Sequence, residues 1–185
     1  MHNFAYICVM KKKTVIELHR IGVDEFRSAE KIPLIVVLDD VRSLNNIGSV
    51  FRTSDAFLVE HIYLCGITAT PPSPEIHKTA LGDEDSVEWS HEPDVLALVR
   101  RLKSEGVTVC AVEQVHHSVM LDHFHAEPSR RYAIVLDNEV KGVAQSVVDE
   151  ADVCIEIPQH GTKHSLNISI SAGIVIWDFF KQLFR

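Results

Sequence analysis

Short runs of apolar, mostly β-branched residues alternate along the chain with segments whose apolar positions recur at helical spacing. Such runs, without polar alternation, are typical of strands buried on both faces, and their alternation with helices indicates a mostly parallel sheet. The predicted strands are residues 33–38, 61–65, 107–112, 132–136 and 151–157, and the predicted helices are 47–57, 93–105, 143–150 and 166–183. The pattern therefore predicts an α/β fold with helices on both faces of the sheet.

The first part of the chain departs from this alternation. We expect residues 14–31 to form a helix, or a helix and a loop, outside the sheet, which gives an N-terminal extension, 1–32, and one domain, 33–185. Met10 precedes three lysines and has the place of an alternative start, so we interpret residues 1–9 as an extension. Because the basic cluster follows the short apolar segment instead of preceding it, the N-terminus lacks the pattern of a secretory signal.

The composition is that of an ordinary globular protein, with 46% apolar and 24% charged residues, which argues against disorder and coiled coil. No apolar run reaches the roughly 18–20 residues that a membrane span needs, so no membrane association is expected. The four cysteines are Cys8, Cys65, Cys110 and Cys154, and they form no CxxC motif. We interpret three of them as core residues of a protein in a reducing compartment, the cytoplasm.

The net charge of −8, from 18 Lys and Arg against 26 Asp and Glu, disfavours binding to nucleic acid in general. Six acidic residues lie between positions 83 and 94 without any Lys or Arg among them. A local basic patch nevertheless suffices for RNA binding in an acidic protein. Lys11, Lys12 and Lys13, with Arg20 and Arg27, are a candidate patch, for which RNA contact and a solvated face remain equally open.

Polar residues follow three of the predicted strands, at the carboxyl ends where open parallel sheets bind their ligands. After the first strand come Asn46, Gly48 and Arg52; on spacing alone, Asn46 as a helix N-cap with Arg52 as a surface residue is favoured over a site. After the fourth strand, residues 137–142 combine acid, amide and base, which fits either a capped turn or a polar site.

The loop after the fifth strand is the most informative segment. Ser165 is a natural N-cap for the last helix, so a capped core helix and a site are both compatible with the pattern. Asn167, Ser169 and Ser171, however, enter an otherwise apolar helix, where buried polar groups need partners.

Together the three loops resemble the SpoU (TrmH-like) branch of the SPOUT superfamily of RNA ribose 2′-O-methyltransferases. The first motif of that branch, Asn-x-Gly-x-x-x-Arg, is matched from Asn46 to Arg52. The second is matched by Asn138-Glu139 and Gly142, and the third, the longest and most specific, from Ile157 to Ile174. The resemblance covers residues 33–180, with one departure: Asp137 stands where the family usually has Gly.

The resemblance implies a deep C-terminal trefoil knot, a homodimer, RNA as partner and S-adenosylmethionine as methyl donor, with no metal. The positions that match donor-binding residues are Leu136, Asp137, Asn138, Gly142, Ile157, Gln159, Gly161 and Leu166. The positions that match catalytic and RNA-site residues are Asn46, Arg52, Glu139, Ser165 and Asn167. DNA is not an expected substrate, because the 2′-OH distinguishes RNA from DNA.

The chemistry favours a particular role for Arg52. A guanidinium stays protonated, with a pKa above about 12, so we interpret Arg52 as a clamp on the phosphate beside the acceptor ribose. A water or a phosphate oxygen would then accept the 2′-OH proton. At Asp137 we expect a Cβ and a need for positive φ to weaken donor binding. We expect tRNA to be favoured over rRNA because the chain is short, and the apolar C-terminal helix to form the dimer interface.

Two alternatives come from other classes. Asp137 and the charge of −8 favour a SPOUT-fold RNA-binding or scaffold protein without catalysis, which need not bind the donor. A nucleotide-binding oxidoreductase is disfavoured because no GxGxxG follows any strand. We interpret His116, His117, His123 and His125 as a solvated loop in preference to a metal site.

Overall fold

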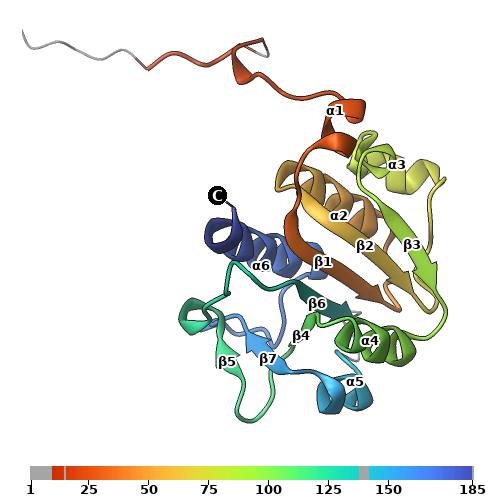
Figure 1. Ribbon diagram of the computed structural model, residues 1–185, viewed down its shortest axis with the longest axis vertical. Helices are drawn as coiled ribbons and strands as arrows, with labels where there is room; N and C mark the ends of the chain where they lie inside the picture. Colours follow the sequence, from red (N-terminus) through yellow and green to blue (C-terminus); the bar gives the residue numbers. More distant parts are fainter. Residues whose placement is uncertain (1–9, 15, 138–141, 185) are drawn as a thin grey trace, which may run out of the picture.

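The computed structural model describes residues 10–14, 16–137 and 142–184, and its strands form one parallel sheet in the order β3-β2-β1-β6-β4-β7-β5. The strands are β1 (Ile32–Asp39), β2 (Val59–Cys65), β3 (Trp89–Glu92), β4 (Thr108–Val112), β5 (Val119–Met120), β6 (Tyr132–Asp137) and β7 (Val153–Glu156). The helices are α1 (Val23–Ser28), α2 (Leu44–Ala56), α3 (Pro74–Ala80), α4 (Val95–Ser104), α5 (Gln145–Glu150) and α6 (Ile168–Leu183). Figure 1 shows this arrangement.

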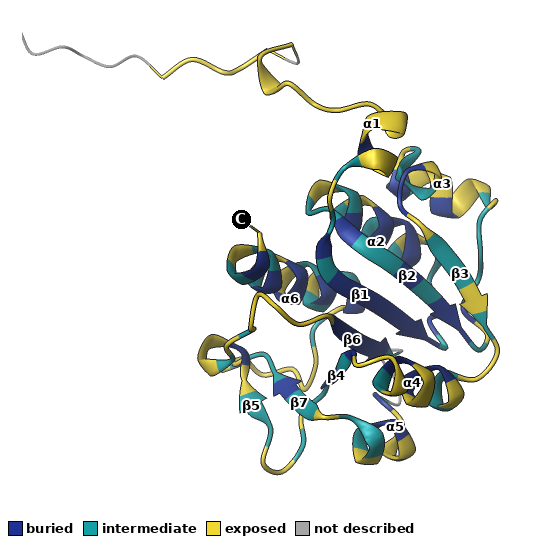
Figure 2. Ribbon diagram, viewed as in Figure 1, coloured by how far each residue is buried: buried dark blue, intermediate teal, exposed yellow. Residues whose placement is uncertain are grey.

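Helices cover both faces of the sheet, as predicted. Along β1, Leu34, Val36 and Leu38 belong to the core that includes residues of α2, α3 and α6. The intervening Ile35 and Val37 belong to the core under α4 and α5. Both faces of the central strands are therefore buried (Figure 2), which is why β1 carries an unbroken apolar run.

The five predicted strands are confirmed, and the sequence pattern missed two others. β3 has the sequence WSHE, with one apolar side chain, and β5 has two residues, so neither presents an apolar run. Helix α3 was also missed, because residues 70–74 predict an irregular loop. That loop ends where Pro74 begins α3, with the Ser73 hydroxyl accepting from the Ile76 amide.

Two predicted helix caps were wrong. α2 begins earlier than expected, and its N-cap is Ser43, whose hydroxyl accepts a hydrogen bond from the Asn46 amide. α6 begins later, and its N-cap is Asn167, whose Oδ1 accepts from the Ser169 amide, so Ser165 does not cap it. These shifts put the Asn46 side chain in the first turn of α2 and leave Ser165 in the loop before α6.

The N-terminal part contains α1 and an arm before it. Phe26 of α1 is buried in the main core, and Arg27 donates to the Asp85 carbonyl. The described residues between 10 and 22 are exposed and lead away from the body of the protein (Figure 1). The division at residue 32 and the trefoil knot both stay predictions. No described helix has the length and apolarity that crossing a membrane requires.

Candidate methyl-donor and RNA site

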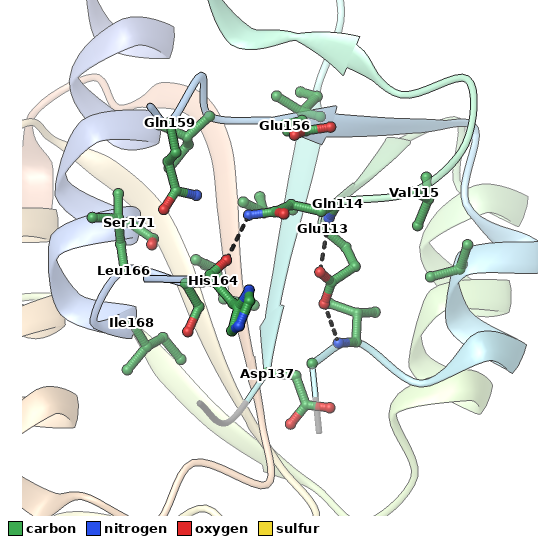
Figure 3. Close-up of a pocket in the computed structure, with 18 of the residues that line it drawn as sticks. Glu113, Gln114, Val115, Asp137, Glu156, Gln159, His164, Leu166, Ile168 and Ser171 are labelled. Atoms are coloured by element: carbon green, nitrogen blue, oxygen red, sulfur yellow. Dashed lines mark hydrogen bonds between the residues drawn. The ribbon is translucent and has the colours of Figure 1, made fainter. Parts of the chain in front are cut away.

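A cavity of about 530 Å³ lies at the carboxyl ends of β4, β6 and β7 (Figure 3). The predicted donor-binding residues that line it are Leu136, Asp137, Gly142, Ile157, Gln159 and Leu166. Ser165, predicted as catalytic, lines it too, while Gly161 does not. Asn138 and Glu139 lie outside the described residues. The second and third motifs thus meet around one cavity, through residues far apart in the sequence.

Gly142 can be explained by its surroundings in this cavity. Its φ is +66°, a left-handed conformation that favours glycine. A Cβ added at Gly142 would lie 2.2 Å from Oε2 of Glu113, closer than any real contact. The glycine of the second motif therefore lets the chain pass directly against the Glu113 carboxylate.

Glu113 and Gln114 at the end of β4 were not recognised from the sequence. Oε1 of Glu113 accepts from the Gln114 amide at 2.7 Å, and Oε2 accepts from the Val143 amide at 2.8 Å. Nε2 of Gln114 donates to the His164 carbonyl at 2.8 Å. The sequence does contain a signal for them, because these polar residues also follow a buried strand directly, as the polar residues of the three motif loops do.

Asp137 is the last residue of β6 and pairs in register with Asp39 at the end of β1. Its φ is not positive, so the expected backbone strain at this position was wrong: strand pairing continues through residue 137 and keeps it extended. Burial, followed by the charges of Asp137, Asp40 and Asp94, raises the pKa of Asp39 to about 7.

The cavity is acidic. Glu113, Asp137 and Glu156 line it, and the described lining residues include no Lys or Arg. In a partly buried site this surplus of carboxylates favours a cationic ligand over a neutral or anionic one. The rest of the lining consists of apolar side chains such as Leu136 and Ile157, the chain at Gly142, and the polar residues Gln114, Gln145, Gln159, His164, Ser165 and Ser171.

The first and third motifs meet at the N-termini of α2 and α6. Nδ2 of Asn167 donates to Oδ1 of Asn46 at 3.2 Å. Oγ of Ser169 donates to Oδ1 of Asn167 at 2.6 Å, which fixes the Asn167 amide in the orientation that reaches Asn46. Two of the predicted catalytic residues are therefore hydrogen-bonded to each other across 121 positions of sequence.

Arg52 lies outside the donor cavity, on the exposed side of α2. With Lys78 of α3 it lines a separate shallow hollow, whose other residues are Ser49, Thr53, Ala56, Phe57 and Thr79. Burial and the charge of Asp55 raise the pKa of nearby Asp83 to about 6, and Arg52 opposes that shift. The hollow presents two cations, which suits a phosphate, whereas the hydroxyls of Ser49, Thr53 and Thr79 already donate to backbone carbonyls.

Close packing of α3 against α2 builds this hollow. A Cβ at Gly48 would lie 2.2 Å from the Ile76 carbonyl oxygen and 2.2 Å from Oγ1 of Thr79. Thr79 also donates to the Asn45 carbonyl at 3.0 Å. The glycine of the first motif thus allows the contact that sets Lys78 beside Arg52.

The described residues contain no group of three or more His, Cys, Asp or Glu side chains placed to hold a metal ion. Cys65, Cys110 and Cys154 are free thiols, and burial raises the pKa of Cys65 to about 12. These thiols are therefore poor nucleophiles at neutral pH, and neither metal nor thiol chemistry has a candidate site in this part of the chain.

The family model described as the SpoU rRNA Methylase family matches residues 33–177. The chain belongs to the SpoU family. A 23S rRNA (guanosine-2′-O-)-methyltransferase of Nitrosomonas europaea is 31% identical over 153 residues, 80% of this chain and 56% of that protein. A mouse tRNA (guanosine(18)-2′-O)-methyltransferase is 27% identical over 150 residues, 80% of this chain and 9% of that protein. This SpoU chain thus spans about half the length of the bacterial relative.

The fold agrees with this membership. The crystal structure of an AdoMet-bound rRNA methyltransferase from Sinorhizobium meliloti matches with a TM-score of 0.76 and 27% identity, over 86% of this SpoU chain and 61% of that one. The predicted family and the predicted mostly parallel α/β fold are therefore confirmed.

Proposed function

We propose that this SpoU protein transfers the methyl group of S-adenosylmethionine to a ribose 2′-OH of RNA. The observation that carries the proposal is the acidic cavity at the ends of β4, β6 and β7, in which residues of the second and third motifs come together. The relative from Sinorhizobium meliloti, an rRNA methyltransferase with AdoMet bound, supports the same conclusion. The relatives from Nitrosomonas europaea and mouse are both named as 2′-O-methyltransferases.

The donor fits the residues of this cavity. S-adenosylmethionine carries a cationic sulfonium and an ammonium group, and the carboxylates of Glu113, Asp137 and Glu156 line the space. When bound, the donor supplies an electrophilic methyl group. Apolar residues, Leu136, Ile157 and Leu166 among them, exclude water from its aromatic and aliphatic parts, while backbone groups beside Gly142 approach closely because no Cβ intervenes.

The acceptor RNA is held by the hollow on α2 and α3. Arg52 and Lys78 bind the phosphate beside the acceptor ribose and orient its 2′-OH for in-line attack. The guanidinium charge of Arg52 stabilises negative charge that develops on the oxygen, while water or a phosphate oxygen takes the proton. The hydrogen-bonded pair of Asn46 and Asn167 keeps together the starts of α2, which carries Arg52, and α6, which follows the donor-cavity loop.

The protein acts as a homodimer in this proposal. α6 leaves Ile170, Ile174 and Trp177 exposed by 55%, 38% and 48%, although large apolar side chains on one helix face normally find a partner. Trp177 continues into an aromatic cluster with Phe57 and Phe180, and Phe57 also lines the RNA hollow. A second copy packed on this face would bring its own Arg52 hollow towards the donor cavity of the first.

We propose tRNA as the substrate and the cytoplasm as the location. The name of the mouse relative supports tRNA, whereas the rRNA names of the bacterial relatives make rRNA the competing outcome. The free thiols fit a reducing compartment.

Calorimetry with S-adenosylmethionine, followed by methyl transfer to separate tRNA and rRNA pools, tests the proposal. We expect donor binding and transfer to tRNA alone. Transfer to rRNA alone would overturn the choice of tRNA. Donor binding without transfer to any RNA, or no donor binding at all, would favour the second candidate, an RNA-binding scaffold, for which the acidic Asp137 in place of glycine is the motivating feature.

A further inference from the structure

We propose that Glu113 and Gln114 are positioning residues for the methyl donor, which hold two walls of its cavity in the binding geometry. They lie at the end of β4, outside the three motifs by which the family was recognised. The proposal rests on the proposed function, because it concerns the same cavity.

Glu113 holds the wall that carries Gly142. Its carboxylate receives the Val143 amide through one oxygen and the Gln114 amide through the other, at 2.8 and 2.7 Å (Figure 3). A hydrogen bond from a backbone N–H to a carboxylate is about twice as strong as one between neutral groups. Because Gly142 has no Cβ, the chain lies directly against this carboxylate, so the position of Gly142 depends on the position of Glu113.

Gln114 holds the opposite wall. Its side-chain amide donates to the His164 carbonyl, in the loop that continues through Ser165 and Leu166 into α6. The Glu113 carboxylate in turn receives the backbone amide of Gln114, so the two contacts share one short segment of backbone. Loss of either contact would remove a hydrogen bond that ties one wall of the cavity to the end of β4.

Glu156 provides a matched control within the same cavity. It is also a carboxylate lining the cavity, but its Oε2 accepts from the Ser118 hydroxyl at 2.7 Å and it holds neither Val143 nor His164. Glu156→Gln and Glu113→Gln therefore remove the same charge. In Glu113→Gln, however, the NH₂ group of the new side chain also faces one of the two backbone N–H groups, so one of the two hydrogen bonds is lost.

The first experiment measures donor affinity calorimetrically in these two variants of the full chain. We expect Glu113→Gln to raise the Kd for S-adenosylmethionine by about 10–100-fold, the range expected for a hydrogen bond to a charged group. Glu156→Gln should raise it less. The KM for RNA should stay within about twofold in Glu113→Gln, because the RNA hollow is separate. An equal or larger effect of Glu156→Gln would overturn the proposal, since charge alone would then explain both results.

The second experiment tests the contact between Glu113 and Gly142 by a double-mutant cycle. Gly142→Ala should weaken donor binding in the wild-type background, where its methyl group meets the carboxylate. In the Glu113→Ala background that collision is absent and only the strain of alanine at a φ of +66° remains, so the same substitution should cost at least about threefold less. Additive effects would mean that the two residues do not act through each other, and would overturn the proposal.

The third experiment measures the backbone hydrogen bonds of the two cavity walls in the absence of the donor. Amide hydrogen exchange at Val143 should be slow in the wild type and at least about tenfold faster in Glu113→Gln. Gln114→Ala should raise the donor Kd by about 2–10-fold while leaving the Val143 exchange rate as it is. Unchanged exchange at Val143 in Glu113→Gln would refute the proposed contact whether or not the protein is a methyltransferase. A wild type that binds no donor would instead refute the proposed function.

Discussion

Replacing Gly48 by alanine should destabilise the protein and disturb the RNA hollow together. The new methyl group would lie 2.2 Å from the Ile76 carbonyl oxygen and from Oγ1 of Thr79, so α3 has to move away from α2. One of these atoms belongs to the backbone of α3, which no side-chain rotation can remove. The substitution therefore acts on the packing of two helices, and through it on the place of Lys78 beside Arg52.

Two opposing terms set the size of the effect. Overpacking of a close contact typically costs about 1–3 kcal/mol. Alanine is intrinsically better than glycine within a helix by about 1 kcal/mol, and Gly48 lies inside α2. The expected net loss is therefore up to about 2 kcal/mol in the free energy of unfolding, and RNA affinity should fall more than donor affinity.

Urea denaturation of the variant, with Ser54→Ala as its control, measures this loss. Ser54 lies in the same helix and is fully buried, and its hydroxyl has no hydrogen-bond partner in the described part of the chain. Alanine at position 54 removes that unsatisfied group and gains helix propensity, so it should stabilise the protein by about 0.5–2 kcal/mol. A Gly48→Ala protein as stable as the wild type, with unchanged RNA affinity, would refute the close packing of α3 on α2.

Arg52→Ala should lower methyl transfer by about 100-fold or more with donor affinity unchanged, and wild-type turnover would exclude the clamp. Trp177→Asp should convert the dimer to a monomer in light scattering at micromolar concentration; a wild type that is already monomeric would contradict the proposed interface. The pKa of Asp39 is about 7 in the folded protein against an ordinary 3.8, so its ionisation destabilises the fold as pH rises between these values. Asp39→Asn should thus be more stable than the wild type by up to about 4 kcal/mol near pH 8, with the difference vanishing towards pH 4, and a difference independent of pH would contradict the assignment.

The sequence predicted the parts of the fold that produce long apolar runs. All five such runs became strands of the sheet, because strands buried on both faces consist mainly of apolar residues. β3, β5 and the short helix α3 have no comparable apolar run. Their formation depends on tertiary contacts that the local spacing of apolar residues does not encode. Helix starts were misplaced by two or three residues for the same reason: Ser43 and Asn46 are both acceptable caps for α2, as Ser165 and Asn167 are for α6, and the tertiary structure decides between them.

The parts of the site that belong to a sequence motif were predictable. The positions around Leu136, Ile157 and Leu166 met in one cavity, and Asn46 met Asn167. What sequence spacing could not supply was the backbone conformation of Asp137, which strand pairing with β1 keeps extended. Sequence spacing also gave no indication that Glu113 accepts a hydrogen bond from Val143. That contact spans 30 residues and joins the loop after β4 to the loop after β6.

The measurement that tests the central claim most directly is the location of the methyl group on RNA. The protein is incubated with labelled S-adenosylmethionine and either total RNA or DNA, and the labelled nucleosides are then identified by nuclease digestion and mass spectrometry. The account predicts a label on the 2′-oxygen of a ribose in tRNA, none in DNA, and at least about 100-fold less label with Arg52→Ala under the same conditions. A label on a base, or equal labelling by Arg52→Ala, would contradict it.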